Sequence, residues 1–259
     1  MLATRSPDNP VRLEIGSGIA EIILNRPPLN VLDIDALRQL NEALTACRSS
    51  GIRVVLIRSA LERAFSAGVD VRDHTRSRLP AMLAEVRKQA HLLLTLESVT
   101  VAAVHGSTLG GGAELALLCD EVIAADDMRL GFPEITLGAF PPVAAALLPQ
   151  QSPARTAMRL LLGEVVPAAL AEQLGLLTRV VPRAGLDESA HLRVQDLAAL
   201  SGVAVHALVR AVRGARAVET LHRLDAAIAA YEDLVGPSAD AQEGIDAFLE
   251  KRSPAWSHR

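Results

Sequence analysis

The feature that most constrains the fold is an alternation of short, wholly apolar runs with longer segments of helical period. Apolar runs occupy residues 54–57, 101–104 and 122–125. Residues 34–47 and 79–94 instead place apolar side chains on one face of a helix. Strands that are apolar throughout are buried on both faces, which is typical of a parallel sheet with helical crossovers. The sequence therefore predicts an α/β fold.

The two ends of the chain depart from this alternation. Residues 11–15 and 19–24 have β-like composition, and the glycines at 16 and 18 allow a tight turn between them, so they predict a hairpin. From Ser152 onward the pattern is mostly helical, with one strand-like piece at residues 177–182. We therefore expect a helical region appended to the α/β core.

Composition and charge exclude several classes of protein. No uncharged apolar run approaches the roughly 18 residues of a membrane span, because the longest candidate, residues 138–150, contains Pro141, Pro142 and Pro149. A net charge of -4 and an aromatic content of 2% argue against nucleic acid as the main partner. We expect neither membrane insertion nor nucleic-acid binding.

The amino terminus and the cysteines indicate the compartment. The chain reaches Asp8 and Pro10 before any apolar stretch develops, so the hydrophobic region of a signal peptide is lacking. Cys47 and Cys119 have no partner at metal-ligand spacing. We expect a cytoplasmic protein with buried, reduced thiols and no metal.

Three consecutive glycines, Gly110 to Gly112, follow an apolar run and precede a helical segment. Glycines let backbone N–H groups approach a ligand closely, and a helix N-terminus adds partial positive charge. This pattern is typical of an oxyanion-binding site, although a tight turn packed against a neighbouring strand would explain it equally well. The spacing does not fit a dinucleotide-binding loop.

Two glutamates stand in apolar contexts, Glu114 after the glycines and Glu134 in the segment 130–138. Desolvation raises the pKa of a carboxyl group toward neutrality, where it suits proton transfer. Taken singly, each would more often be a glutamate at a pocket rim or one held by hydrogen bonds.

Four arginines recur in the C-terminal region, at Arg210, Arg213, Arg216 and Arg223. The favoured interpretation is a solvated helix face, and the alternative is attraction for a phosphorylated ligand or an acidic neighbour.

Ten short motifs in a fixed order carry a resemblance to a known family. They are Leu24-Asn-Arg-Pro27, Asn30-Val-Leu32, Phe65-Ser-Ala-Gly-Val-Asp70, Ala102-Ala-Val-His-Gly106, Gly110-Gly-Gly-Ala-Glu114, Cys119-Asp120, Pro133-Glu-Ile-Thr-Leu-Gly138, Gly175-Leu176, Val180-Val-Pro182 and Phe248-Leu-Glu-Lys-Arg252. From about Val11 to Trp256 the chain resembles the crotonase, or enoyl-CoA hydratase/isomerase, family.

The resemblance implies a ClpP-like fold of repeated ββα units in a spiral. Residues 1–190 would form this core with the CoA and acyl sites, and residues 191–259 a helical trimerisation region. The implied partners are an acyl-CoA substrate and further copies of the chain, as a homotrimer or a dimer of trimers. No cofactor is implied, because coenzyme A enters as part of the substrate.

The resemblance also implies roles for individual residues. The N–H groups of Val69 and Gly111 would bind the thioester oxygen, Glu114 would activate water, and Glu134 would deliver a proton to carbon. The Ala67 carbonyl would lie near the adenine amine. The remaining substrate- or CoA-binding candidates are Arg26, Asp70, Gly110, Phe140 and Lys251, the last near the CoA phosphates or, equally, in a surface salt bridge.

One further stretch of the sequence indicates the class of acyl group in the substrate. The stretch 140–149 departs from the commonest hydratase pattern and resembles the cyclohexa-1,5-diene-1-carbonyl-CoA hydratases of benzoyl-CoA breakdown. Apolar walls suit an uncharged ring or chain, and the candidates for those walls are Phe140, Val143, Met82, Leu83 and Val86. For the last three, ordinary core packing is an equal alternative. For His74 and His105 a structural or surface role is favoured.

Two other functions remain open. An enoyl-CoA isomerase would need Glu134 alone, and a non-catalytic CoA-binding scaffold would need neither glutamate. Retention of both carboxylates favours hydration.

The apolar stripe formed by Leu221, Leu224, Ala227, Ile228 and Tyr231 exceeds what a solvated helix needs. A three-fold neighbour is expected to cover it.

Overall fold

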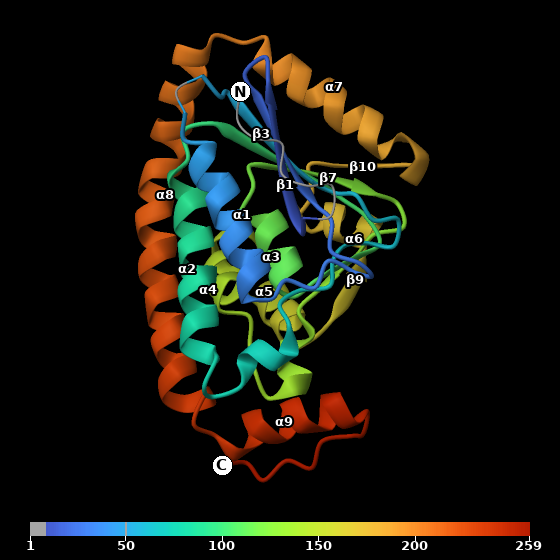
Figure 1. The fold of residues 1–259 in the computed structure, drawn as a ribbon, viewed down its shortest axis with the longest axis vertical. Helices are drawn as coiled ribbons and strands as arrows, with labels where there is room; N and C mark the ends of the chain where they lie inside the picture. Colours follow the sequence, from blue (N-terminus) through green and yellow to red (C-terminus); the bar gives the residue numbers. More distant parts are fainter. Residues whose placement is uncertain (1–8, 50) are drawn as a thin grey trace.

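A computed structural model of the chain describes residues 9–49 and 51–259 (Figure 1). The amino-terminal residues 1–8, on which the absence of a signal peptide was predicted, lie outside the described residues. The main sheet has six strands in the order β1-β2-β3-β5-β7-β10. They are β1 (Val11–Gly16), β2 (Ile19–Leu24), β3 (Val54–Ser59), β5 (Val99–Val104), β7 (Glu121–Ala125) and β10 (Arg179–Val181). The hairpin β1-β2 is antiparallel and every other pairing is parallel, so the predicted hairpin and parallel sheet are confirmed.

A second sheet of four short strands has the order β4-β6-β8-β9. These strands are β4 (Ala64–Ser66), β6 (Ser107–Leu109), β8 (Arg129–Gly131) and β9 (Val165–Pro167). The first three each follow a strand of the main sheet and precede a helix, which makes three successive ββα units and confirms the spiral. Runs of three residues are too short to show a β period, and the chain pattern alone did not locate them.

Helices cover both faces of the main sheet (Figure 1). Their bounds are α1 (Ile34–Ala46), α2 (Leu79–Thr95), α3 (Gly111–Leu117), α4 (Pro142–Gln151), α5 (Ala154–Leu161), α6 (Ala168–Gln173), α7 (Leu186–Ala198), α8 (Gly202–Ala230) and α9 (Ala239–Glu250), with 3-10 turns η1 (Val71–His74), η2 (Pro133–Leu137) and η3 (Arg183–Gly185) and the π-helical η4 (Tyr231–Val235). The helix α7 lies on one face of the sheet and α1, α2 and α8 lie on the other, whereas α9 lies at the end of the molecule beside η2 (Figure 1). The helix α1 begins where the Asp33 carboxylate accepts a hydrogen bond from the Ala36 N–H, and its apolar stripe is buried.

Alternate residues of the central strands enter two separate cores. Val55 and Ile57 of β3 belong to the large core beneath α1, α2 and α4. Val54 and Leu56 face the smaller core, which α7 covers with residues such as Ala190. The sheet is therefore buried on both faces, as its apolar strands predicted. Cys47 and Cys119 are free and buried, which confirms the expectation for both thiols.

The apolar stripe of α8 packs within its own chain, so the prediction that a neighbour covers it is wrong. The helix lies beside α2 and α4 (Figure 1). Leu224 and Tyr231 are 0% and 2% exposed, and Leu221 and Ile228 pack against the same core. The apolar stripe correctly predicted a buried helix face, but that face packs on the core of its own chain.

Arg213 also departs from the predicted solvated face. Its guanidinium is buried, pairs with Asp120, and donates to the carbonyls of Leu93, Leu96 and Ser98. Arg210 and Arg223 do lie on the exposed face of α8. Buried guanidinium groups need several partners, and this one ties α8 to the end of α2 and to the main sheet.

Within the described ranges, no single helix is long and apolar enough to span a bilayer. By length and composition alone, the pair formed by residues 183–198 and 202–235 reaches that threshold together, and it is bent by 103°.

Candidate active site

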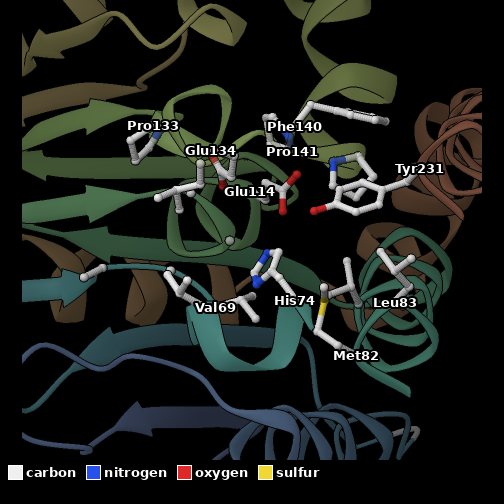
Figure 2. A pocket seen from close by; sticks show the side chains of 18 of the residues that line it. Val69, His74, Met82, Leu83, Glu114, Pro133, Glu134, Phe140, Pro141 and Tyr231 are labelled. Carbon is white, nitrogen blue, oxygen red and sulfur yellow. The ribbon is translucent and has the colours of Figure 1, made fainter. Parts of the chain in front are cut away.

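One cavity of about 820 Å³, including space open to solvent, lies where the two sheets meet the helices. Figure 2 shows its side chains. It is lined by Ala67, Gly68, Val69, Val71, His74, Met82, Leu83, Val86, Gly110, Gly111, Glu114, Pro133, Glu134, Thr136, Leu137, Phe140, Pro141, Pro142, Tyr231 and Phe248. Both predicted glutamates and both predicted amide positions therefore lie in the same cavity.

Glu114 enters the cavity from α3. Its side chain is buried, and Oε1 accepts a hydrogen bond of 2.8 Å from the Ala144 N–H at the start of α4. Burial raises the pKa of Glu114 to about 7, and the N–H groups of Ala144 and Val143 partly oppose this rise. The sequence left open that Glu114 is simply held by hydrogen bonds. One of its oxygens, Oε1, does accept such a bond, but the carboxyl group is also removed from solvent.

Glu134 enters from η2, and its Oε2 is buried without a hydrogen-bond partner among the described residues. Burial and the charge of Glu114 raise the pKa of Glu134 to about 8. Figure 2 shows the two carboxyl groups side by side. Two desolvated carboxyls that repel each other favour a state with one proton between them near neutral pH.

Beside these carboxyl groups lie two backbone N–H groups that donate to no acceptor among the described residues. The bridge between Leu32 and Val69 uses the N–H groups of Leu32 and Asp70, which leaves the Val69 N–H without a protein acceptor among the described residues. The same holds for the N–H of Gly111, the first residue of α3. A Cβ placed on Gly111 would stand 2.7 Å from the Val69 Cγ2 and 3.5 Å from its nitrogen, so the two donors are close together.

Gly110 lies between the amides and the acid. Its φ of 51° favours glycine, and a Cβ there would stand 2.5 Å from the Glu134 Oε1. Glycine is therefore required at position 110 both by the backbone conformation and by the approach of Glu134.

The remaining predicted ligand residues divide into two groups. Ala67 and Phe140 line the cavity. Arg26 instead pairs with Asp33 and donates to the Val31 carbonyl, and neither Asp70 nor Lys251 lines the cavity.

Asp70 and Lys251 are placed by local contacts. Asp70 accepts hydrogen bonds from Arg72, which lower its pKa, and Lys251 is an exposed residue that ends α9. Contacts of Arg26, Asp70 and Lys251 with CoA stay predictions.

The acyl-wall candidates are mostly in place. Met82, Leu83 and Val86 line the cavity, whereas the Val143 side chain is buried outside it. His74 lines the cavity too, although a structural or surface role was favoured for it.

Two further lining residues, Tyr231 and Phe248, were not predicted as site residues. Tyr231 was assigned to the apolar stripe of a helix. The sequence feature that could have singled it out is that it is the only tyrosine in the sequence.

Comparisons with known proteins agree with this architecture. The family model described as enoyl-CoA hydratase/isomerase matches residues 14–259. Among curated proteins, the 2,3-dehydroadipyl-CoA hydratase of Escherichia coli is 35% identical over 92% of this chain and 94% of its own length. The cyclohexa-1,5-dienecarbonyl-CoA hydratase of Thauera aromatica is 33% identical over 96% of both chains. The chain belongs to the enoyl-CoA hydratase/isomerase family.

A solved structure supports the same placement. The enoyl-CoA hydratase from Mycobacterium avium subsp. paratuberculosis superposes with a TM-score of 0.84 at 27% identity, over 97% of this chain and all of that one. The fold is that of the crotonase family, and the protein is an enzyme of the enoyl-CoA hydratase type.

Proposed function

We propose that the protein is an acyl-CoA hydro-lyase that adds water to an α,β-unsaturated thioester. One observation carries the proposal. Two desolvated carboxyl groups with raised pKa values lie in one cavity beside two unclaimed backbone N–H groups.

The two N–H groups of Val69 and Gly111 fit the electrostatic demand of the reaction. Addition of water to a conjugated thioester builds negative charge on the thioester oxygen. Preorganised amide donors stabilise such charge by roughly 3 kcal/mol each where single donors have been removed from other enzymes. These two amides are the proposed oxyanion hole.

The carboxyl pair fits the proton transfers. We assign the negative charge to Glu114, whose Oε1 accepts the Ala144 N–H, and the shared proton to Glu134, whose Oε2 has no hydrogen-bond partner among the described residues. Glu114 therefore takes a proton from water, and Glu134 gives one to the α-carbon. Because the pair is coupled, the two groups share both tasks to some degree.

The cavity wall favours an uncharged acyl group. Apart from the two glutamates, the described lining is mainly apolar, and neither lysine nor arginine lies in it. A smaller hollow shares Val71, His74, Leu137 and Tyr231 with this cavity, but it has space for no more than about one water molecule, so the acyl group is proposed to lie in the main cavity. The Thauera relative acts on a cyclic dienoyl thioester, so a substrate of that kind belongs in the proposal.

The CoA part is proposed to run from Ala67 toward Arg26, Asp70 and Lys251. A homotrimer or a dimer of trimers is proposed as the assembly, with Lys251 approaching the CoA phosphates of its own or a neighbouring subunit.

A panel of linear enoyl-CoA and cyclic dienoyl-CoA thioesters tests the proposal. We expect a gain of the mass of one water molecule with at least one of them. An enzyme that moves the double bond without adding water would instead be the isomerase that uses Glu134 alone. An enzyme that binds the thioesters and changes none would be a scaffold.

A further inference from the structure

Tyr231 is placed at the carboxyl pair by a break in helix geometry. The long helix α8 ends at Ala230, and the chain continues as the π-helical turn η4, which Tyr231 begins. Such turns are rare and frequently occur at functional sites. The Tyr231 ring packs on Phe140, with ring centroids 5.0 Å apart and planes inclined by 37°. The phenol is thus held rigidly on one wall of the cavity.

The hydroxyl of Tyr231 has no partner of its own. The residue is 2% exposed, and its hydroxyl makes no hydrogen bond to any described residue. Figure 2 shows the oxygen directed into the cavity toward the Glu114 carboxyl. The hydroxyl oxygen is not among the fully buried atoms of the described residues that lack a partner, so it meets the space of the cavity, and an oxygen atom that occupies this space is its expected partner.

The surroundings keep this hydroxyl a donor. Burial, together with the charges of Glu134 and Glu114, raises the pKa of Tyr231 further above its usual range. The other side-chain donors of the described lining are engaged, since the Thr136 hydroxyl donates to the Pro133 carbonyl and the His74 Nδ1 donates to the Asp70 carbonyl. Tyr231 therefore presents a neutral O–H beside two carboxyl groups.

We infer that the Tyr231 hydroxyl is a third catalytic group, which donates a hydrogen bond to the oxygen of the water molecule that becomes the β-hydroxyl. The inference rests on the proposed hydratase function. Glu114 takes one proton of the water as the C–O bond forms, the π electrons move to the thioester oxygen, and the proton of Glu134 ends on the α-carbon. Tyr231 keeps its proton throughout and fixes the direction of the water lone pair.

The substitution Tyr231→Phe isolates the hydroxyl, because phenylalanine keeps the ring that packs on Phe140. We expect kcat for hydration to fall about 10- to 100-fold, as for loss of a hydrogen bond near a charged group, with KM changed less than about twofold. Exchange of the α-proton of butyryl-CoA in D₂O needs only the amides and a carboxylate, so it should keep the wild-type rate. Tyr231→Leu, which also removes the ring, should lower kcat and raise KM.

Three results would overturn this role. They are a Tyr231→Phe enzyme with undiminished hydration, a parallel loss of hydration and α-proton exchange, and a change in KM alone. If Tyr231→Leu is defective while Tyr231→Phe is not, the ring acts by packing only. A wild-type enzyme that hydrates no thioester overturns the proposed function itself, whereas a hydrating wild type with an unaffected Tyr231→Phe variant overturns the role of Tyr231 alone.

Discussion

At the residue scale, the acid Glu134 sits where its ionisation opposes folding. Burial and the charge of Glu114 raise its pKa from 4.5 to about 8. Between these two values the folded protein binds more protons than the unfolded chain. The stabilisation from this carboxyl is therefore fully present when the pH is below 4.5, and it is lost as the pH rises through about 8.

A neutral side chain at this position should remove that pH dependence. We expect Glu134→Gln to raise Tm relative to the wild type at about pH 8 and to change it little at about pH 5, because the glutamine never ionises. Thermal unfolding at the two pH values measures this, with the exposed Glu188→Gln as the control. A Tm difference that is the same at both pH values would contradict the raised pKa.

Gly111 offers a second test among single residues. A Cβ at this position would stand 2.7 Å from the Val69 Cγ2 and 3.5 Å from the Val69 nitrogen, so a valine would place its side chain where the two amides are proposed to hold the thioester oxygen. Gly111→Val should reduce kcat/KM far more than folding stability, without altering the pH dependence set by the glutamates. A folded variant within about tenfold of the normal kcat/KM, a loss of about 1.4 kcal/mol, would place the oxyanion hole elsewhere.

At the element scale, α9 approaches the turn that carries Glu134 through a glycine. A Cβ on Gly244 would stand 2.1 Å from the Leu137 carbonyl oxygen in η2. Gly244→Ala must therefore push α9 away from η2, and we expect it to lower both Tm and hydration activity. In the exposed interior of α8, a Cβ on Gly214 would meet nothing within 4 Å, so Gly214→Ala should stabilise by up to about 1 kcal/mol. If Gly244→Ala changes Tm and hydration activity no more than Gly214→Ala does, then the close packing of α9 does not hold η2 in place.

The sequence predicted the long elements because their periods span many residues. The helices near residues 34–47 and 79–94 and the strands of the main sheet all formed as expected. The short strands β4, β6 and β8 carry no measurable period, and they were implied only by the family resemblance. The sequence pattern also could not predict which surface an apolar helix face packs against. The stripe that includes Leu224 indicated that this face is buried, but not that its own chain covers it.

The candidate site was predictable to a similar extent. Glu114, Glu134, Val69 and Gly111 were found because they belong to motifs, and the fold brings them into one cavity. Tyr231 lies more than 90 residues from those motifs in sequence. Only the three-dimensional packing of α8 against α2 and α4 places it opposite the carboxyl pair.

At the scale of the whole molecule, we expect the apolar residues that remain exposed to form contacts between copies of the chain. On α8, Val203, Leu208, Val212 and Val218 are exposed, on the side away from the buried stripe. We expect light scattering to give three or six times the chain mass of 27.4 kDa. Val212→Asp combined with Val218→Asp should shift the mass toward the monomer if this face is the interface. A wild-type monomer at micromolar concentration would contradict the assembly.

The central claim is that two buried glutamates hydrate an acyl-CoA in one cavity. The most direct measurement is the steady-state hydration rate of Glu134→Gln, compared with wild type and with the exposed Glu188→Gln, on a thioester that the wild type hydrates. The amide keeps the shape of the acid but cannot deliver the proton, so kcat should fall by about 10²- to 10⁴-fold while Glu188→Gln stays at the wild-type rate. A folded Glu134→Gln enzyme with undiminished kcat would contradict the two-carboxylate mechanism.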